Sequence, residues 1–142
     1  MYSTILVPVD LDDEHSWRKP MPTAVALCRA FGATLHVVTV APEFGLPSVA
    51  AYFPPDYEAK VHHELGGRLR ELVAAQVPAE IGATPHLVHG APYHGILEAA
   101  KGVGADLIVM GSHRPELSDY LIGPNAARVV RHADCSVMVV RE

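Results

Sequence analysis

The 142-residue chain is poor in lysine, in aromatic residues and in cysteine, and it contains no long apolar run. Its formal net charge is −5 with histidine neutral, and its lysines, Lys19, Lys60 and Lys101, are scattered rather than grouped. An acidic chain without a basic patch is not expected to bind nucleic acid. No segment approaches the roughly 20 apolar residues that cross a bilayer, so membrane insertion is not expected either.

The two cysteines, Cys28 and Cys135, lie in apolar segments and are predicted to be small core residues. A pair of cysteines in a chain of this length argues against a disulfide framework. The first strand follows Met-Tyr-Ser-Thr directly, without the charged and apolar regions of a signal peptide. We therefore expect a single soluble, cytoplasmic domain over residues 1–142.

Apolar residues make up 49% of the chain, which suits a sheet that is covered by helices. Short apolar segments predict five buried strands at 3–10, 34–40, 84–89, 107–110 and 137–140. Apolar spacing and helix-end signals predict four helices at 23–31, 56–76, 96–101 and 123–132. Pro20 and Pro22 fit only the first turn of the first helix. The segment 10–14 is predicted to be an acidic loop, and 90–94 a turn.

Strands and helices alternate along the whole chain, without a break in composition or an internal repeat. This pattern predicts an α/β fold, an open five-stranded parallel sheet with helices on both faces. Right-handed crossovers place the carboxyl ends of all strands at one edge of the sheet, and ligands bind there where the strand order reverses. The loops after Asp10, Val40, His89 and Met110 therefore lie at the candidate site.

Several common motifs are missing. There is no Gly-Lys-Ser/Thr sequence for a Walker loop, and Gly102-Val-Gly104 is followed by Ala-Asp-Leu, which is not a Rossmann fingerprint. The nine histidines show no close metal-ligand spacing. Ser112-His113 has no identifiable acid to orient the histidine, so hydrolase chemistry is not predicted.

The run from Asp106 to Arg141 carries the clearest functional signal. It reads as a buried strand, a glycine-containing loop, a helix and a second buried strand. Free backbone amides and the positive end of a helix dipole converge where a strand end meets a helix start. The run therefore predicts a phosphate site in a nucleotide-handling protein.

The chain resembles the universal stress protein family over essentially its whole length. The segments ILVPVD, LHVVTV, HGAPYHGILEAAKGVGADLIVMGSH and RVVRHADCSVMVV match the character of that family. The resemblance implies a Rossmann-like fold of the adenine nucleotide alpha hydrolase type, and binding of ATP or AMP. It also implies a homodimer or a higher homo-oligomer formed through the final strand, from Val137 to Val140.

The same resemblance assigns an adenine and ribose pocket to Pro8, Val9, Asp10 and Val40. A carboxylate at a strand end, such as that of Asp10, is suited to accept a hydrogen bond from a ribose hydroxyl or an adenine amine. The alternative is that Asp10 is a loop acid that caps the following helix. The acids that come next either hold Mg²⁺ beside the phosphates or are solvated loop residues: Asp12, Asp13 and Glu14.

The phosphate end of the site is assigned, again by resemblance, to the second half of the chain. Met110 and Gly111 would meet the ribose and the first phosphates through their backbone. Gly123 would lie beside the phosphates at the start of a helix. The amides of Asn125 and Ala126 point outward from that helix end.

Two residues depart from the pattern of the ATP-binding members, which is Gly-x2-Gly-x9-Gly followed by Ser or Thr. Arg114 stands at the second glycine position, Pro124 replaces the Ser or Thr, and the loop between is one residue short, as in a "SHRP" subgroup of the family. Proline offers a phosphate neither an N–H nor a hydroxyl. Arg114 is a candidate replacement, because a guanidinium grips phosphate oxygens. The alternative is that it pairs at the surface with Glu116 or Asp119.

Together these features predict a universal stress protein that binds an adenine nucleotide. It would act as a stress-response regulator through its oligomeric state and an unidentified protein partner. An enzyme is not predicted, because no activated nucleophile or general base is identifiable. Two alternatives stay open, a weak Mg²⁺-dependent ATPase and a nucleotide-free dimeric interaction module with a degenerate phosphate site. The apolar loop from Phe44 to Phe53 would be a second subunit contact or a lid over the cleft.

Overall fold

The computed structural model describes residues 1–41, 56–112 and 123–141. Its strands are β1 (Thr4–Pro8), β2 (Thr34–Ala41), β3 (Thr84–His89), β4 (Leu107–Gly111) and β5 (Ser136–Val140). They form one sheet in the order β3-β2-β1-β4-β5, and every neighbouring pair runs parallel. The predicted five-stranded parallel sheet is confirmed. The predictions for Arg114 and for the loop from Phe44 to Phe53 lie outside the described residues.

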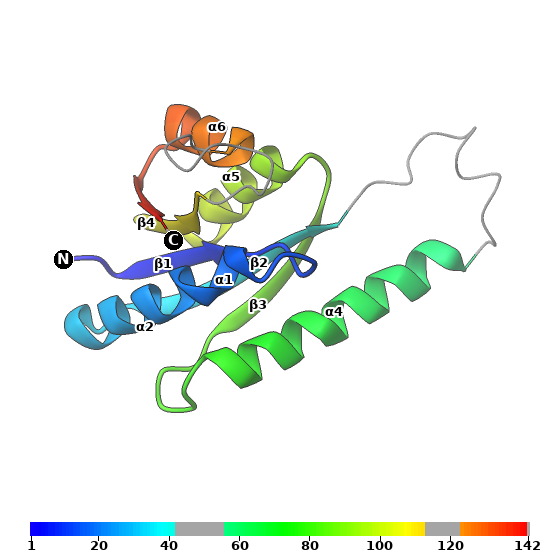
Figure 1. The fold of residues 1–142 in the computed structure, drawn as a ribbon, viewed down its shortest axis with the longest axis horizontal. Helices are drawn as coiled ribbons and strands as arrows, with labels where there is room; N and C mark the ends of the chain where they lie inside the picture. Colours follow the sequence, from blue (N-terminus) through cyan, green and yellow to red (C-terminus); the bar gives the residue numbers. More distant parts are fainter. Residues whose placement is uncertain (42–55, 113–122, 142) are drawn as a thin grey trace.

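Helices cover both faces of the sheet (Figure 1). They are α1 (His15–Arg18), α2 (Pro20–Phe31), α4 (Tyr57–Gln76), α5 (Pro92–Val103) and α6 (Pro124–His132). Alternate strand residues point to opposite faces, and this divides the core into two clusters. Ile5, Val7 and Val37 pack on the side of α2 and α4, whereas Leu6 and Val38 pack on the side of α5 and α6.

The strand order places the predicted ligand edge between two particular strands. The chain steps outward from β1 to β2 and β3, and then returns to add β4 on the other side of β1. The connection after β1 and the connection after β4 therefore run in opposite directions across the sheet. A crevice lies between them, at the carboxyl ends of β1 and β4. The final strand, β5, lies at one outer edge of the sheet, as predicted.

The sequence placed most element ends within one or two residues, but the starts of α2 and α5 differ by more, and α1 was not predicted. The segment 90–94 was predicted to be a turn before a short helix, but α5 begins at Pro92 and continues through Gly95. Proline is well suited to the first helical position, where no N–H is needed. The predicted acidic loop at 10–14 agrees with the structure, whereas α1, a single helical turn at His15–Arg18, lies in a stretch for which no element was predicted.

Smaller predictions have mixed outcomes. Pro20 and Pro22 do lie in the first turn of α2, which begins at Pro20 rather than at Thr23. Cys28 is buried, as expected, but Cys135 is only half-buried. Burial raises the pKa of the Cys28 thiol. Among the helices of the described residues, none combines the length and the apolar character that crossing a membrane requires.

Candidate functional site

A pocket opens at the carboxyl edge of the sheet, where the connections after β1 and β4 diverge. Its walls come from the ends of β1, β2 and β4, from the loop after β1, and from the first turns of α5 and α6. The lining residues are Pro8, Val9, Asp10, Asp13, Ser16, Val38, Thr39, Val40, Pro92, Ile96, Met110, Gly111, Ser112, Gly123, Asn125 and Ala126. The pocket therefore combines an apolar interior with polar groups at strand and helix ends.

The exit of β1 into the pocket is fixed by hydrogen bonds to β2. The Val9 amide donates to the Val38 carbonyl at 2.8 Å, which extends the parallel ladder past the last strand residue. The Thr39 hydroxyl, which is buried, donates to the Val9 carbonyl at 2.9 Å. Val9 is itself buried. Asp10 thus follows a residue that two hydrogen bonds hold against β2.

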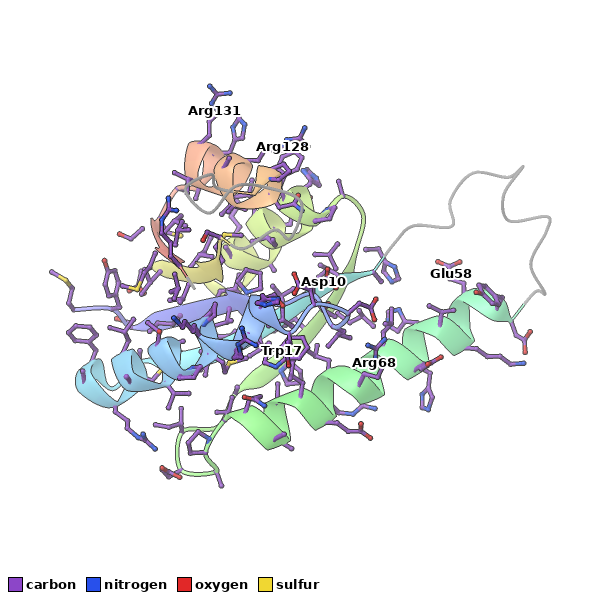
Figure 2. The ribbon with its side chains drawn as sticks, in the orientation of Figure 1. Asp10, Trp17, Glu58, Arg68, Arg128 and Arg131 are labelled. Atoms are coloured by element: carbon purple, nitrogen blue, oxygen red, sulfur yellow. The ribbon has the colours of Figure 1, made fainter. Side chains whose placement is uncertain are left out.

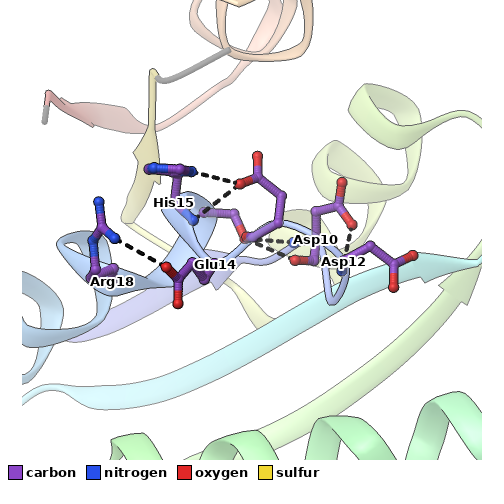
Figure 3. A network of polar contacts seen from close by, with 7 residues as sticks. Asp10, Asp12, Glu14, His15 and Arg18 are labelled. Atoms are coloured by element: carbon purple, nitrogen blue, oxygen red, sulfur yellow. Dashed lines mark hydrogen bonds and ion pairs between the residues drawn. The ribbon is translucent and has the colours of Figure 1, made fainter. Parts of the chain in front are cut away.

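Residues 10–16 form a tight loop around Asp10 (Figure 3). The Asp12 amide donates to the Asp10 carboxylate at 3.0 Å, and the Asp13 amide donates to the Asp10 carbonyl at 3.0 Å. The Ser16 hydroxyl accepts from the Asp10 amide at 2.8 Å and donates to the Asp13 carbonyl at 2.7 Å. This network leaves the Asp10 side chain exposed at the pocket with one carboxylate oxygen committed to the loop.

The start of α6 forms another part of the pocket wall. Gly123 precedes the helix in an extended conformation, and Pro124 occupies the first helical position. The Gly123 amide donates to the Ser112 carbonyl at 3.3 Å. Because the first amides of a helix have no intrahelical acceptor, Asn125 and Ala126 offer two N–H groups to the pocket. The positive end of the α6 dipole lies at the same place, beside the pocket.

Two glycines allow close packing beside the pocket. A Cβ at Gly95 of α5 would lie 2.9 Å from a methyl group of Val40, so a larger residue would push against the pocket wall. A Cβ at Gly111 would lie 3.1 Å from the His15 carbonyl. Both positions let a helix approach a strand that lines the pocket.

A model of the universal stress protein family matches residues 1–141. The chain belongs to the universal stress protein family. Universal stress protein G of Escherichia coli O157:H7 is 33% identical over 145 residues, covering 99% of this chain and 100% of that protein. The resemblance inferred from the sequence is thereby confirmed.

Solved universal stress proteins share the fold. UspA from Lactobacillus plantarum is 27% identical with a TM-score of 0.74, covering 99% of this chain and 98% of that chain. A universal stress protein in complex with cAMP is 25% identical with a TM-score of 0.64, covering 99% and 97% of the two chains. The similarity in fold thus spans nearly the whole of each chain.

The structure brings nine of the predicted site residues of this universal stress protein to one pocket. They are Pro8, Val9, Asp10, Val40, Met110, Gly111, Gly123, Asn125 and Ala126. The tenth, Arg114, lies outside the described residues. For Asp10, the predicted alternative of a helix cap does not hold, because its carboxylate accepts from Asp12 within the loop. It is Asp13 whose carboxylate accepts from the His15 amide at the start of α1.

Seven pocket residues were not among the predicted nucleotide contacts: Asp13, Ser16, Val38, Thr39, Pro92, Ile96 and Ser112. Val38 and Thr39 precede Val40 on β2, so a strand-end rule that counted two more residues would have included them. Pro92 and Ile96 were missed because the start of α5 was read as a turn. Ser16 had no sequence signal, since its contact with Asp10 depends on the shape of the loop.

Each of the acidic residues 12–14 beside the pocket has an arginine or a histidine as a neighbour. Asp12 pairs with Arg68 at 3.0 Å, Asp13 approaches His15 at 3.1 Å, and Glu14 pairs with Arg18 at 3.1 Å. Within residues 1–41, 56–112 and 123–141, no group of three or more metal-ligating side chains is found. His62, one of the nine histidines, faces His89 with 2.9 Å between two ring nitrogens.

Proposed function

We propose that this universal stress protein binds an adenine nucleotide in the pocket between β1, β4 and α6. The observation that carries the proposal is that Asp10 and the first residues of α6 line one pocket together with apolar side chains. A nucleoside phosphate needs that combination, with a carboxylate for hydroxyl groups, apolar walls for a base, and amides for phosphate.

Each part of the nucleotide has a proposed neighbour. The base packs against the apolar side chains of Val9, Val40 and Met110. The ribose hydroxyls donate to the free oxygen of the Asp10 carboxylate. The first phosphate meets the amides of Asn125 and Ala126 and the backbone of Gly111, and it lies close to Gly123. A phosphate contact by Arg114 stays a prediction.

The similarity to a universal stress protein that forms a complex with cAMP supports an adenine mononucleotide as the ligand class. The start of α6 also offers few donors for a second or third phosphate, so a longer phosphate chain should gain little affinity. Pro124 has no N–H, and the Gly123 amide already donates to Ser112. We therefore propose that AMP and ATP bind with affinities within about tenfold of each other, since one charged hydrogen bond more or less is worth about that factor.

A stress-response role is proposed to operate through oligomer and partner contacts. In the described sheet β5 is an edge strand, and its sequence, Ser-Val-Met-Val-Val, is almost wholly apolar. An edge strand of this kind is suited to pair with another chain, and we propose a homodimer through β5. Light scattering at micromolar concentration tests this point, and a monomer would refute it.

The binding proposal is tested by the nucleotide content of freshly purified protein. Denaturation should release an adenine nucleotide, identified by chromatography of the supernatant. If none is released, titration of the protein with AMP and ATP by calorimetry decides. Absence of heat with both would favour the nucleotide-free interaction module. Phosphate release from ATP above that of a buffer control would instead favour the ATPase alternative.

A further inference from the structure

Helix α4 reaches the loop that carries Asp10 through one arginine. Arg68 extends from α4 toward the turn that follows β1 (Figure 2). One of its terminal nitrogens donates to the Leu11 carbonyl at 3.1 Å and to the Asp12 carboxylate at 3.0 Å. Arg68 and Asp12 are 56 residues apart in the sequence. A surface side chain of a distant helix therefore holds the backbone and a side chain of the same turn.

The contact continues from this turn to the pocket. Asp12, which Arg68 holds through its carboxylate, donates its own amide to the Asp10 carboxylate at 3.0 Å. That bond sets the orientation of the Asp10 carboxylate, and Asp10 lines the pocket. The sequence of contacts thus runs from Arg68 to Asp12, and from Asp12 to Asp10.

We propose that Arg68 is a positioning residue of the nucleotide site, which holds the loop after β1 so that Asp10 presents an oxygen to the ribose. The inference rests on the proposed function, because it assigns a role in that same pocket. Arg68 itself does not line the pocket. Its contribution is to limit the conformations of the loop before the nucleotide arrives, which reduces the ordering cost of binding.

The exposure of the pair separates this role from a role in folding. The side chains of Arg68 and Asp12 are 39% and 83% exposed. Ion pairs that are this accessible to water contribute little to the stability of a fold. Removing Arg68 should therefore leave the melting temperature nearly unchanged while it loosens the loop.

The first test compares Arg68→Ala with Arg70→Ala, which removes the same charge from the same helix. We expect Arg68→Ala to weaken ATP binding about three- to fivefold, and Arg70→Ala to change it less than about twofold. Calorimetric titration measures both. Equal weakening by the two variants would show that only the long-range attraction of a cation for ATP had been lost, and would overturn the proposal.

The second test uses Asp12→Ala, which breaks the pair from the loop side and keeps Arg68. Electrostatics alone predicts tighter binding of an anionic nucleotide after an acid is removed. The proposal predicts weaker binding, because the loop loses one of its two hydrogen bonds to Arg68 and keeps only the one at the Leu11 carbonyl. This variant also serves if Arg68→Ala fails to fold. Tighter or unchanged binding would contradict the proposal.

A ligand lacking the ribose hydroxyls gives the sharpest readout. For 2′,3′-dideoxy-ATP there is no hydroxyl for Asp10 to hold, so Arg68→Ala should bind it as the unmodified chain does, within about twofold. An equal loss for ATP and the dideoxy analogue would mean that Arg68 supports the pocket in general rather than Asp10, and would overturn the assignment.

Hydrogen exchange of the nucleotide-free protein tests the tie without any ligand. Amides of residues 11–15 should exchange faster in Arg68→Ala than in Arg70→Ala. If the unmodified chain binds neither AMP nor ATP, the proposed function fails, whatever the exchange result. If it binds nucleotide normally and Arg68→Ala does too, only the role of Arg68 fails.

Discussion

The Gly123 amide and the Ser112 carbonyl are joined by a hydrogen bond of 3.3 Å. The bond connects the end of β4 to the start of α6, and it uses a donor that would otherwise point toward a phosphate. With Pro124 next in the chain, the first donors that α6 can offer are the amides of Asn125 and Ala126. In the proposed nucleotide site, the start of α6 therefore offers a phosphate fewer donors than a helix start generally does.

Substituting Pro124 by serine should restore hydrogen-bond donors for a phosphate at the start of α6. Pro124→Ser supplies an N–H and a hydroxyl at the first helical position, and hydrogen bonds to charged groups are worth about 1.5–3 kcal/mol each. We expect ATP affinity to rise about tenfold, with a cost in stability of about 1 kcal/mol or less from added freedom of the unfolded chain. Pro124→Ala, which adds the N–H alone, is the matched control. Unchanged ATP affinity in both variants would contradict the donor argument.

Asp10→Ala should weaken AMP and ATP equally. The Asp10 carboxylate lies at the ribose end of the pocket, which the two nucleotides share, and its loss should cost about tenfold or more in affinity. Asp10→Asn keeps an acceptor for the Asp12 amide, so we expect its affinity to lie between those of the unmodified chain and Asp10→Ala. Titration of each nucleotide into each variant measures the effect. A loss confined to ATP would place Asp10 at the phosphates instead.

Gly95→Ala should destabilise the protein and disturb the pocket. The new Cβ would stand 2.9 Å from a methyl group of Val40, whose branched side chain has little freedom to move. We expect a loss of about 1–3 kcal/mol in the free energy of unfolding. Gly102→Ala, in the same helix, meets nothing within 4 Å and should be neutral or slightly stabilising. Urea denaturation compares the two, and equal effects would refute the packing argument.

Asp106 gives a pH-dependent prediction. Hydrogen bonds from the Thr4 and Ser3 amides, at 3.0 Å and 2.8 Å, hold the pKa of the Asp106 carboxyl below its ordinary value. A depressed folded pKa contributes stability that is complete above the unfolded pKa, about 3.9, and is lost as pH falls through the folded pKa. The stability gap between the unmodified chain and Asp106→Asn should thus be constant near neutral pH and should shrink in acid. A gap that widened in acid would contradict the assignment.

The strands and most helices could be predicted because their apolar patterns are local. Runs such as Ile5–Val7 and Ile108–Met110 are buried on both faces, so composition alone identifies them. The register of strand ends follows from the parallel sheet, which is why residues as distant as Asp10 and Met110 were expected in one place. The short helix α1 escaped prediction because a single turn has no periodicity to detect.

The contacts that shape the site from outside the strand ends could not be predicted. Arg68 lies on a helix whose exposed face carries several charges, and nothing in the sequence distinguishes it from Arg70. The hydrogen bond between Gly123 and Ser112 likewise forms only because the fold brings the end of β4 next to the start of α6. Pairings of this kind depend on the path of the whole chain, whereas pattern reasoning uses only neighbours in the sequence.

The central claim is that the pocket between β1, β4 and α6 holds an adenine nucleotide. Calorimetric titration of nucleotide-stripped protein with AMP, in parallel with Asp10→Ala, tests it most directly. We expect saturable binding with one AMP per chain, weakened about tenfold or more in Asp10→Ala. Absence of heat at millimolar AMP and ATP, or equal binding by the variant, would contradict it.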